Sequence, residues 1–174
     1  ITMKYWINSE EVVGSHSAAV MIDPQWQNKG LIKFVADKLI KEVEKQKIPF
    51  TYGFPNDKAY DLHIKLLGYE DVAAQRLFKK AMAYSENNYS DTVPDRLVWR
   101  KIERFDDRAD VLWEKVKNDF KAIVLRNSAF LNWRYLDRPD VPYHAFGAYN
   151  GDILEGYCVL KLYRAENVSR GHFI

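Results

Sequence analysis

The stretch "MIDPQWQNKGLIKFV", residues 21–35, contains a strand end, a turn and a helix start. It overlaps the end of a short apolar run at residues 17–22, "SAAVMI", which stops at Asp23-Pro24 and predicts a buried strand. From Gly30 onward, apolar residues recur at three- and four-residue steps and predict an amphipathic helix of roughly four to five turns. These residues are Leu31, Ile32, Val35, Ala36, Leu39, Ile40 and Val43.

The residues that follow this helix predict a second strand and a second helix. "FTYGF" at 50–54 comes after Pro49 and is typical of a strand. Asn56 or Asp57 can cap a helix over 58–67, with Gly68 as its C-terminal stop. Because a strand, a crossover helix and a strand form a βαβ unit, we expect the two strands to be parallel.

The loop between the first strand and the first helix has features of an anion site. A helix start presents backbone N–H groups without partners, together with the positive end of the helix dipole. Gly30 lets a ligand approach the backbone, while Lys29 and Lys33 add positive charge. A strand-to-helix turn that binds nothing has a similar sequence, so both interpretations stay open.

The second half of the chain predicts a further set of elements. Residues 72–82 fit either a helix or a strand, and the polar segment 85–95 is typical of a linker. "RLVWRKI" predicts a strand, and Asp106 or Asp107 caps a helix that runs to about Phe120. "AIVLR" is extended, "SAFLNWRYL" has helical spacing, and Asn150-Gly151 predicts a hairpin between two apolar strands.

Composition excludes several classes of protein. A net charge of +2 and the lack of a basic cluster argue against nucleic-acid binding. No apolar run approaches the roughly 20 residues of a membrane span, and no signal peptide is visible. The single Cys158 cannot form an internal disulfide, which favours a reducing, cytoplasmic compartment. Its four histidines lack metal-ligand spacing, so we expect no metal site.

Residues 16–72 resemble the core of the GNAT superfamily of N-acetyltransferases. The pyrophosphate loop of that family has the pattern Gln/Arg-x-x-Gly-x-Gly/Ala, which here runs from Gln27 through Gly30 to Ile32. The first and central positions match, whereas Ile32 stands where the family has glycine or alanine. Downstream, "TYGFPNDKAYDLHIKLLGYEDV" is similar to the family's next strand, asparagine-containing loop, helix and glycine-aromatic ending.

The resemblance implies an α/β (α+β) fold with a mixed, mostly antiparallel sheet flanked by helices. A central parallel pair of strands would splay apart at the cofactor site. The implied cofactor is acetyl-CoA (coenzyme A), with pantetheine along residues 19–22, including Met21 and Ile22, and against Asn56. The pyrophosphate would be held by the backbone of Gln27, Asn28, Lys29, Gly30, Leu31 and Ile32.

Acyl transfer to an amine needs a general base for the amine and an acid for the departing thiolate. Many GNAT members place a tyrosine where this chain has Ile64. Tyr60 and His63 lie near one helix face and are the candidate catalytic residues. The alternative is that Tyr60 packs in the core and His63 is a surface or capping residue. The candidate strand carries no carboxylate, which leaves His16 and Asp23 as options for the base.

Residues 97–174 resemble the opening of a second GNAT-like unit, as in tandem bacterial proteins. We therefore expect a C-terminal-type GNAT portion at 1–84, a linker at 85–96 and a truncated second unit at 97–174. The ends of the sequence suggest a fragment of a longer protein. Trp133, Arg134 and Tyr135 are candidate substrate-binding residues, with a buried Trp133 beside an outward-pointing Arg134 as the alternative.

Three functions remain open at this point. The first is an acyl-CoA-dependent N-acyltransferase whose acceptor is a small-molecule or polymer amine. The second is an aminoacyl transferase of the tandem cell-wall type, and the third is a non-catalytic module that binds coenzyme A. A homodimer and a contact with a further part of a longer chain are both compatible with the sequence.

Overall fold

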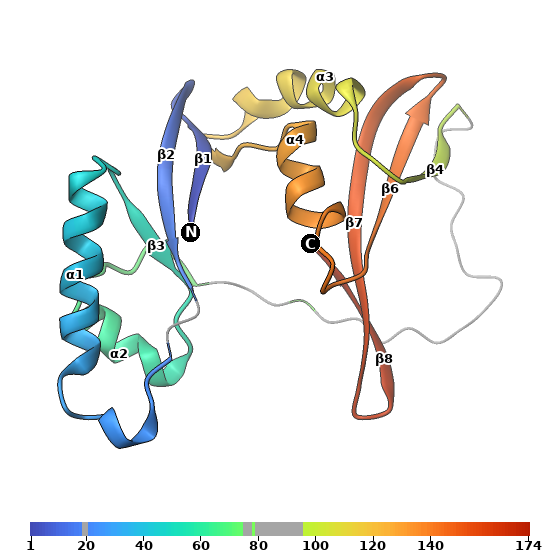
Figure 1. Ribbon diagram of the computed structural model, residues 1–174. Helices are drawn as coiled ribbons and strands as arrows, with labels where there is room; N and C mark the ends of the chain where they lie inside the picture. Colours follow the sequence, from blue (N-terminus) through green and yellow to red (C-terminus); the bar gives the residue numbers. More distant parts are fainter. Residues whose placement is uncertain (19–20, 75–77, 79–95) are drawn as a thin grey trace. The chain divides into compact units, whose positions relative to one another are not determined.

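The computed structural model describes residues 1–18, 21–74, 78 and 96–174. It divides into two units, which are described separately below (Figure 1). The first contains Ile1–Tyr5 and Glu11–Ser85, and the second contains Trp6–Glu10 and Glu86–Ile174. The predicted linker 85–96 lies outside the described residues except for Arg96, as does most of the ambiguous segment 72–82.

The first unit contains a hairpin and a short parallel strand. Strands β1 (Thr2–Ile7) and β2 (Glu10–Ser17) are joined at Asn8 and Ser9, both of which have positive φ. β3 (Thr51–Gly53) pairs with β2 in parallel, with Ser15 opposite Thr51. The sheet order is β3-β2-β1-β5, in which β5 is Ala122–Val124. The expected parallel pair is therefore present, but it lies at an edge of the described sheet and not at its centre.

The strand predicted at residues 17–22 is placed wrongly. β2 ends at Ser17, and neither Met21 nor Ile22 belongs to a strand. Met21 is 92% exposed, although the prediction placed it in a buried strand. The physical reason is that the parallel partner strand, β3, is short. Its pairing with β2 ends at Gly53, opposite Ser17, so β3 offers no backbone hydrogen bonds that would extend β2 further.

Both predicted helices of the first unit are confirmed. A short 3-10 helix, η1 (Pro24–Trp26), precedes α1 (Leu31–Lys45). Helix α2 (Asp57–Lys65) begins at Asn56, whose Oδ1 accepts from the Ala59 N–H at 3.0 Å. Gly68 follows with φ 70°, the left-handed conformation expected of a residue just past a helix end.

The second unit contains the remaining elements, most of them where the sequence predicted. Its strands are β4 (Val98–Ile102), β5 (Ala122–Val124), β6 (Tyr143–Asn150), β7 (Ile153–Ala165) and β8 (Val168–Phe173). Its helices are α3 (Asp107–Val116), the 3-10 turn η2 (Lys117–Asp119), α4 (Ser128–Leu131) and the π-helical turn η3 (Asn132–Leu136).

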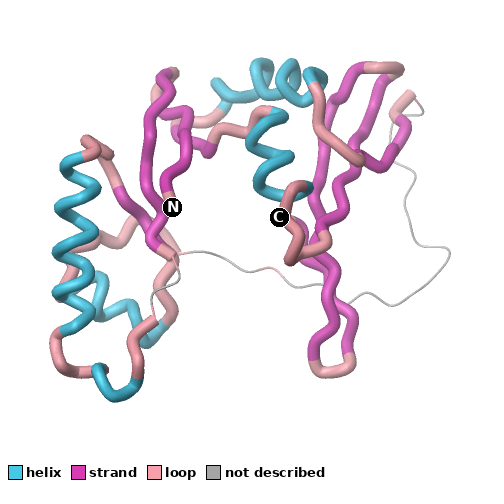
Figure 2. The backbone as a smooth tube through the Cα atoms, in the orientation of Figure 1, coloured by secondary structure: helices cyan, strands magenta, loops and turns pink. Residues whose placement is uncertain are grey.

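The sheet of the second unit is antiparallel, with the order β4-β6-β7-β8. Figure 2 draws the strands in magenta. β6 pairs with the first part of β7 across the predicted Asn150-Gly151 turn, where Gly151 has φ 60°. β8 pairs with the second part of β7, from Leu160 to Ala165. The long β7 is therefore shared by two successive hairpins.

The hydrophobic core belongs to the second unit and joins α3, α4 and η3 to the sheet. Asn132 is a buried polar residue within this core. Its side chain supplies the hydrogen-bond partners that the backbone of Phe105 needs. Asn132 Oδ1 accepts from the Phe105 N–H at 2.9 Å, and Asn132 Nδ2 donates to the Phe105 carbonyl at 2.8 Å. The buried apolar residues of the core are Ile102, Phe105, Ala109, Leu112, Leu131, Tyr135, Ala145, Tyr149, Leu154 and Val159.

The fold class is confirmed at the coarse level: the described residues form a mixed α+β fold with helices and two sheets. Among the helices that the structure describes, none has the length and apolar composition needed to cross a membrane.

Candidate functional site

The loop before α1 is ordered by its own short-range bonds. Asp23 caps η1, its Oδ1 accepting from the Gln25 N–H at 2.9 Å. Gln27 closes the turn twice, since its N–H donates to the Pro24 carbonyl and its Nε2 donates to the Ile22 carbonyl at 3.2 Å. Asn28 and Gly30 then adopt positive φ, 60° and 76°. These bonds set the direction in which the chain enters α1.

The backbone N–H groups at 28–33 have no acceptor among the residues that the structure describes. The first bond of the helix is donated by Phe34 to the Gly30 carbonyl at 3.2 Å. Gly30 is the N-cap and has no side chain with which to accept. A Cβ built on Gly30 would meet no atom within 4 Å, so the space before the helix start is open. The start of α1 is therefore rich in unused donors.

The charges around this helix start are positive. The first turn of α1 has no acidic residue. The Lys29 ammonium lies 5.3 Å from the centroid of the Trp26 ring, and Lys33 bonds to Asp37 one turn later at 3.1 Å. Together with the helix dipole, Lys29 gives the loop a positive potential. An anion would fit this environment better than a neutral group.

Aromatic side chains gather where β2 and β3 end. The His16 ring stacks on Tyr52 at 4.8 Å with an interplanar angle of 8°, and Phe54 meets both rings edge-on. Tyr5 is buried against Phe50 and Tyr52, and its burial raises the pKa of the phenol. His16 is the last residue but one of β2, and ligands of parallel α/β units bind just beyond the carboxyl ends of the strands.

The residues predicted to contact pantetheine lie in different environments. The Met21 side chain is exposed, and Ile22 uses its carbonyl to hold Gln27. Asn56 uses its Oδ1 to cap α2, so the side-chain amide nitrogen is the part left for a ligand. Ala19 and Val20, from the same predicted segment, lie outside the described residues.

The candidate catalytic pair on α2 has two separate sets of contacts. The Tyr60 hydroxyl donates a short hydrogen bond to Asp71, and this bond raises the pKa of the phenol. His63 Nδ1 lies 2.8 Å from the Ala59 carbonyl, and the His63 ring meets Tyr69 edge-on. Because a carbonyl only accepts, Nδ1 carries the proton and Nε2 of the neutral ring is an acceptor. Within the described chain, no hydrogen bond or ring contact joins Tyr60 to His63.

The "NWRY" segment, with its predicted substrate residues, lies on the π-helical turn η3. Trp133 is 53% exposed and packs on Phe130, so the alternative with a buried tryptophan is wrong. Tyr135 is buried in the core against Tyr143, and the Arg134 guanidinium lies over the Tyr135 ring at 5.5 Å. Trp133 and Arg134 are therefore accessible, whereas Tyr135 is mainly a core residue.

Sequence reasoning passed over Arg126, which lies between β5 and α4. Its Nε is buried and has no hydrogen-bond acceptor in the described part of the chain. The available signal was an arginine that directly follows the apolar "AIVL", because such a position brings a charge next to a core.

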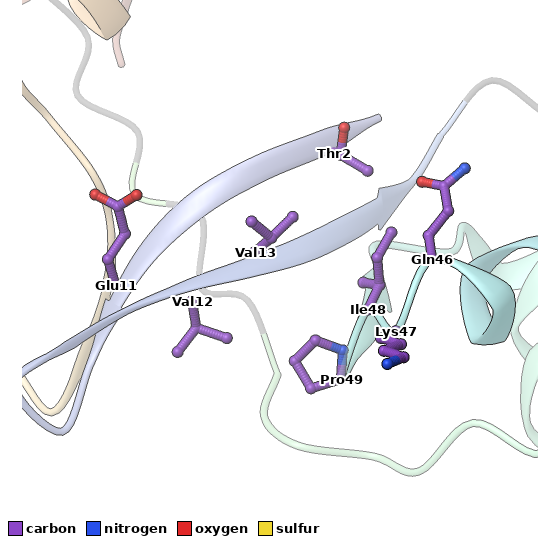
Figure 3. A pocket seen from close by; sticks show the side chains of 8 residues that line it. All are labelled: Thr2, Glu11, Val12, Val13, Gln46, Lys47, Ile48 and Pro49. Carbon is purple, nitrogen blue, oxygen red and sulfur yellow. The ribbon is translucent and has the colours of Figure 1, made fainter.

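A hollow of about 490 Å³ lies in the first unit, away from the predicted site residues. Figure 3 shows its lining side chains, which come from the β1–β2 hairpin and from the segment between α1 and β3. Glu11 at its wall is paired with Lys4 at 2.5 Å. The hollow is lined by Thr2, Glu11, Val12, Val13, Gln46, Lys47, Ile48 and Pro49.

Comparisons with protein-family models, with curated proteins and with solved structures found no match for this chain. Within the described residues, no group of three or more histidine, cysteine, aspartate or glutamate side chains is arranged to hold a metal ion. The function therefore has to be argued from the geometry of the loop and of α2.

Proposed function

We propose that this chain binds an acyl-coenzyme A at the start of α1 and transfers the acyl group to an amine. The observation that carries the proposal is the run of backbone N–H groups at 28–33 that no described residue accepts from. A pyrophosphate offers several anionic oxygens to such a run, and a phosphate at a helix N-terminus gains further from the helix dipole.

The topology around the loop supports a GNAT-like arrangement. β2 pairs in parallel with β3, and the loop and α1 form the crossover between them. This is the strand, loop and helix order on which the sequence resemblance rests. Under the proposal, residues 1–84 belong to a GNAT-type domain. The pantetheine arm of the bound coenzyme A runs past Met21, Ile22 and the Asn56 amide.

The chemistry requires two proton transfers. The amine attacks the thioester carbonyl and loses a proton, and the C–S bond breaks to release a thiolate that takes a proton. Under the proposal His63 Nε2 accepts the first proton, because Nδ1–H is held by the Ala59 carbonyl. Tyr60 would donate the second, and its raised pKa keeps the hydroxyl protonated.

Isothermal titration of the chain with acetyl-CoA tests the binding step. Gly30→Glu should abolish binding, because a carboxylate would stand in the open space before the helix and repel the pyrophosphate. Gly151→Glu is the matched control, since Gly151 also has positive φ and open space around its Cα but lies in the β6–β7 turn. Equal loss in the two variants, or no binding to the wild type at millimolar cofactor, would refute the proposal.

The titration, combined with an assay for acylation of an amine, separates the three functions that the sequence leaves open. Acylation of an amine that is lost in His63→Ala, with binding retained, supports the transferase. Binding without acylation of any amine in a broad panel identifies a non-catalytic coenzyme A module. Turnover with a charged tRNA and none with acetyl-CoA identifies an aminoacyl transferase.

A further inference from the structure

Strand β8 lies at an edge of the sheet of the second unit. Among the described residues, β7 is the strand with which it pairs. β6 pairs with β7 only as far as Lys161, so residues 162–165 of β7 and their partners 168–171 of β8 form a two-stranded arm past β6 (Figure 1). Every residue of β8 is exposed. An exposed strand edge is a template on which the strand of another chain can pair.

The register shows which backbone groups of β8 are open to another strand. The Ile174 N–H donates to the Val159 carbonyl at 3.0 Å, so this position faces β7. Residues of an antiparallel pair alternate between bonding to the partner strand and pointing away from it. The even-numbered residues of β8 therefore bond to β7. No described backbone group bonds to the outward-pointing residues, which are Ser169, Gly171 and Phe173.

One face of the arm is basic. Arg170 and His172 of β8 lie on this face, opposite Tyr163 and Lys161 of β7, respectively. The Tyr163 hydroxyl lies 2.8 Å from His172 Nε2, and the Lys161 ammonium lies 5.7 Å from the centroid of the Tyr163 ring. Arg170 pairs at 2.8 Å with Glu166, the single acidic residue in the sequence from 160 to 174. Cations therefore outnumber carboxylates on this face.

The other face of the arm is mainly apolar. Phe173 is 82% exposed, and Leu162, which lies opposite Gly171, is 50% exposed. Gly171 has no side chain to cover its neighbours, and a Cβ built there would lie 3.4 Å from the side chains of Leu160 and Leu162. An apolar side chain of an added strand could therefore pack over Gly171 against these leucines.

The charges of the sheet edges oppose pairing between two copies of the chain. β8 contains no acidic residue, so two β8 strands in any register would place no carboxylate beside Arg170. β4, at the opposite edge of the same sheet, contains Arg100 and Lys101 and again no acidic residue. Cross-strand pairs of like charge are unfavourable, whereas pairs of opposite charge are favourable. The edge of β8 is therefore complementary to an acidic strand.

We propose that β8 binds an extended segment of a partner protein in which acidic and apolar side chains alternate. The segment adds a strand to the sheet, and its backbone bonds to the outward-pointing groups of β8. Its acidic side chains lie beside Arg170 and His172, while its apolar side chains cover Gly171 and Phe173. The site lies in the second unit and does not depend on coenzyme A binding at α1.

The test is a titration of the full chain with a short labelled peptide of alternating glutamate and valine, followed by fluorescence anisotropy and amide hydrogen exchange. We expect saturable binding that slows exchange of the Ser169, Gly171 and Phe173 amides, because the peptide supplies their acceptors. A peptide of alternating lysine and valine should bind far more weakly. Binding that leaves the exchange of these three amides unchanged overturns the proposal.

Methylation of the peptide backbone separates strand addition from attraction by charge alone. Methyl groups on the valine nitrogens remove the N–H groups along one edge of the peptide strand, and methyl groups on the glutamate nitrogens remove those along the other edge. One set should abolish binding and the other should leave it nearly unchanged, since only one edge faces β8. Equal effects of the two sets overturn the proposal.

Variants of the chain test the two kinds of contact. Arg170→Met should weaken the dissociation constant about two- to fivefold, as expected for an exposed ion pair. Gly171→Pro removes an outward N–H and should weaken it about tenfold. Arg104→Met is the matched control, because Arg104 also pairs with one surface carboxylate but follows β4.

The remaining outcomes identify other occupants. If Gly171→Pro fails to fold, the methylated peptides decide. Sedimentation that shows a dimer of the wild type, lost in Gly171→Pro, would assign the edge to a second copy and overturn the proposal. Tighter binding of a single-stranded oligonucleotide than of the acidic peptide would also overturn it.

Discussion

Helix α1 of the first unit and helix α3 of the second differ in what covers their apolar side chains. α1 has no buried residue, and its Phe34 and Leu39 are 61% and 53% exposed. α3 is shorter, yet Ala109, Leu112 and Trp113 are buried, and the first two belong to the core of its unit. Both sequences have apolar residues at helical spacing, so this pattern predicts a helix without determining what the apolar face packs against.

The two helices also begin differently. The carboxylate of Asp106 caps α3 and accepts from the Arg108 N–H at 3.1 Å, and Asp107 adds a negative charge in the first turn. α1 begins at Gly30, without a side-chain cap and without an acidic residue in its first turn. The start of α3 is thus satisfied by its own side chains, whereas the start of α1 is available to an anion.

The largest expected effect comes from truncating a side chain in the hydrophobic core of the second unit. Leu131 is completely buried, so Leu131→Ala should lower the free energy of unfolding by about 2–5 kcal/mol. Leu39→Ala in α1 removes the same atoms from a half-exposed position and should cost about 1 kcal/mol or less. Urea denaturation measures both. Equal losses would show that the apolar face of α1 is covered in solution.

A smaller effect is expected at Gly14 in β2. A Cβ at this position would overlap the ring of Phe50, which lies directly against the glycine. Gly14→Ala should therefore lower stability by about 1–3 kcal/mol through overpacking. Hydrogen exchange of the β2 and β3 amides measures the change within the first unit.

The matched control for that variant is Gly156→Ala in β7, where an added Cβ meets no atom within 4 Å. We expect a change within about 1 kcal/mol there, because the substitution mainly restricts the unfolded chain. If Gly14→Ala were equally harmless, the packing of Phe50 on β2 would not be a constraint on the first unit.

Local signals predicted most of the elements. The periodicity of α1, the caps at Asn56 and Asp106, and the Asn150-Gly151 turn each depend on residues close in sequence. β1 was not anticipated, and β2 was placed too late in the chain. The extent of a strand depends on its partner, and the partner of β2 is a three-residue strand more than thirty residues away.

The orientation of "NWRY" was predicted less well for a specific reason. Phe130, Trp133 and Leu136 follow the spacing of an α-helix, which places Trp133 toward the core. The chain instead forms a π-helical turn over Asn132–Leu136, and the wider turn brings Tyr135 inward and leaves Trp133 exposed. Arg126 was missed because its neighbour Tyr157 comes from β7, some thirty residues further along the chain, which no local pattern reveals.

The smallest expected effect tests the capped start of α3 through pH. Hydrogen bonds from Arg108 hold the pKa of Asp106 below its ordinary value. The stability from this pair is therefore present above the unfolded pKa of about 3.9 and is lost as the pH falls through the lower folded pKa. Because the pair is exposed to solvent, its contribution to the free energy of unfolding should be small.

Unfolding free energies at about pH 6 and about pH 2 measure this contribution. Asp106→Asn and Arg108→Met should each reduce the fall in stability between the two values, because each removes the pairing that acid disrupts in the wild type. If both variants lost as much unfolding free energy between the two pH values as the wild type, the Asp106–Arg108 pair would not stabilise the start of α3. The contrast between α3 and α1 would then rest on the burial of their apolar side chains alone.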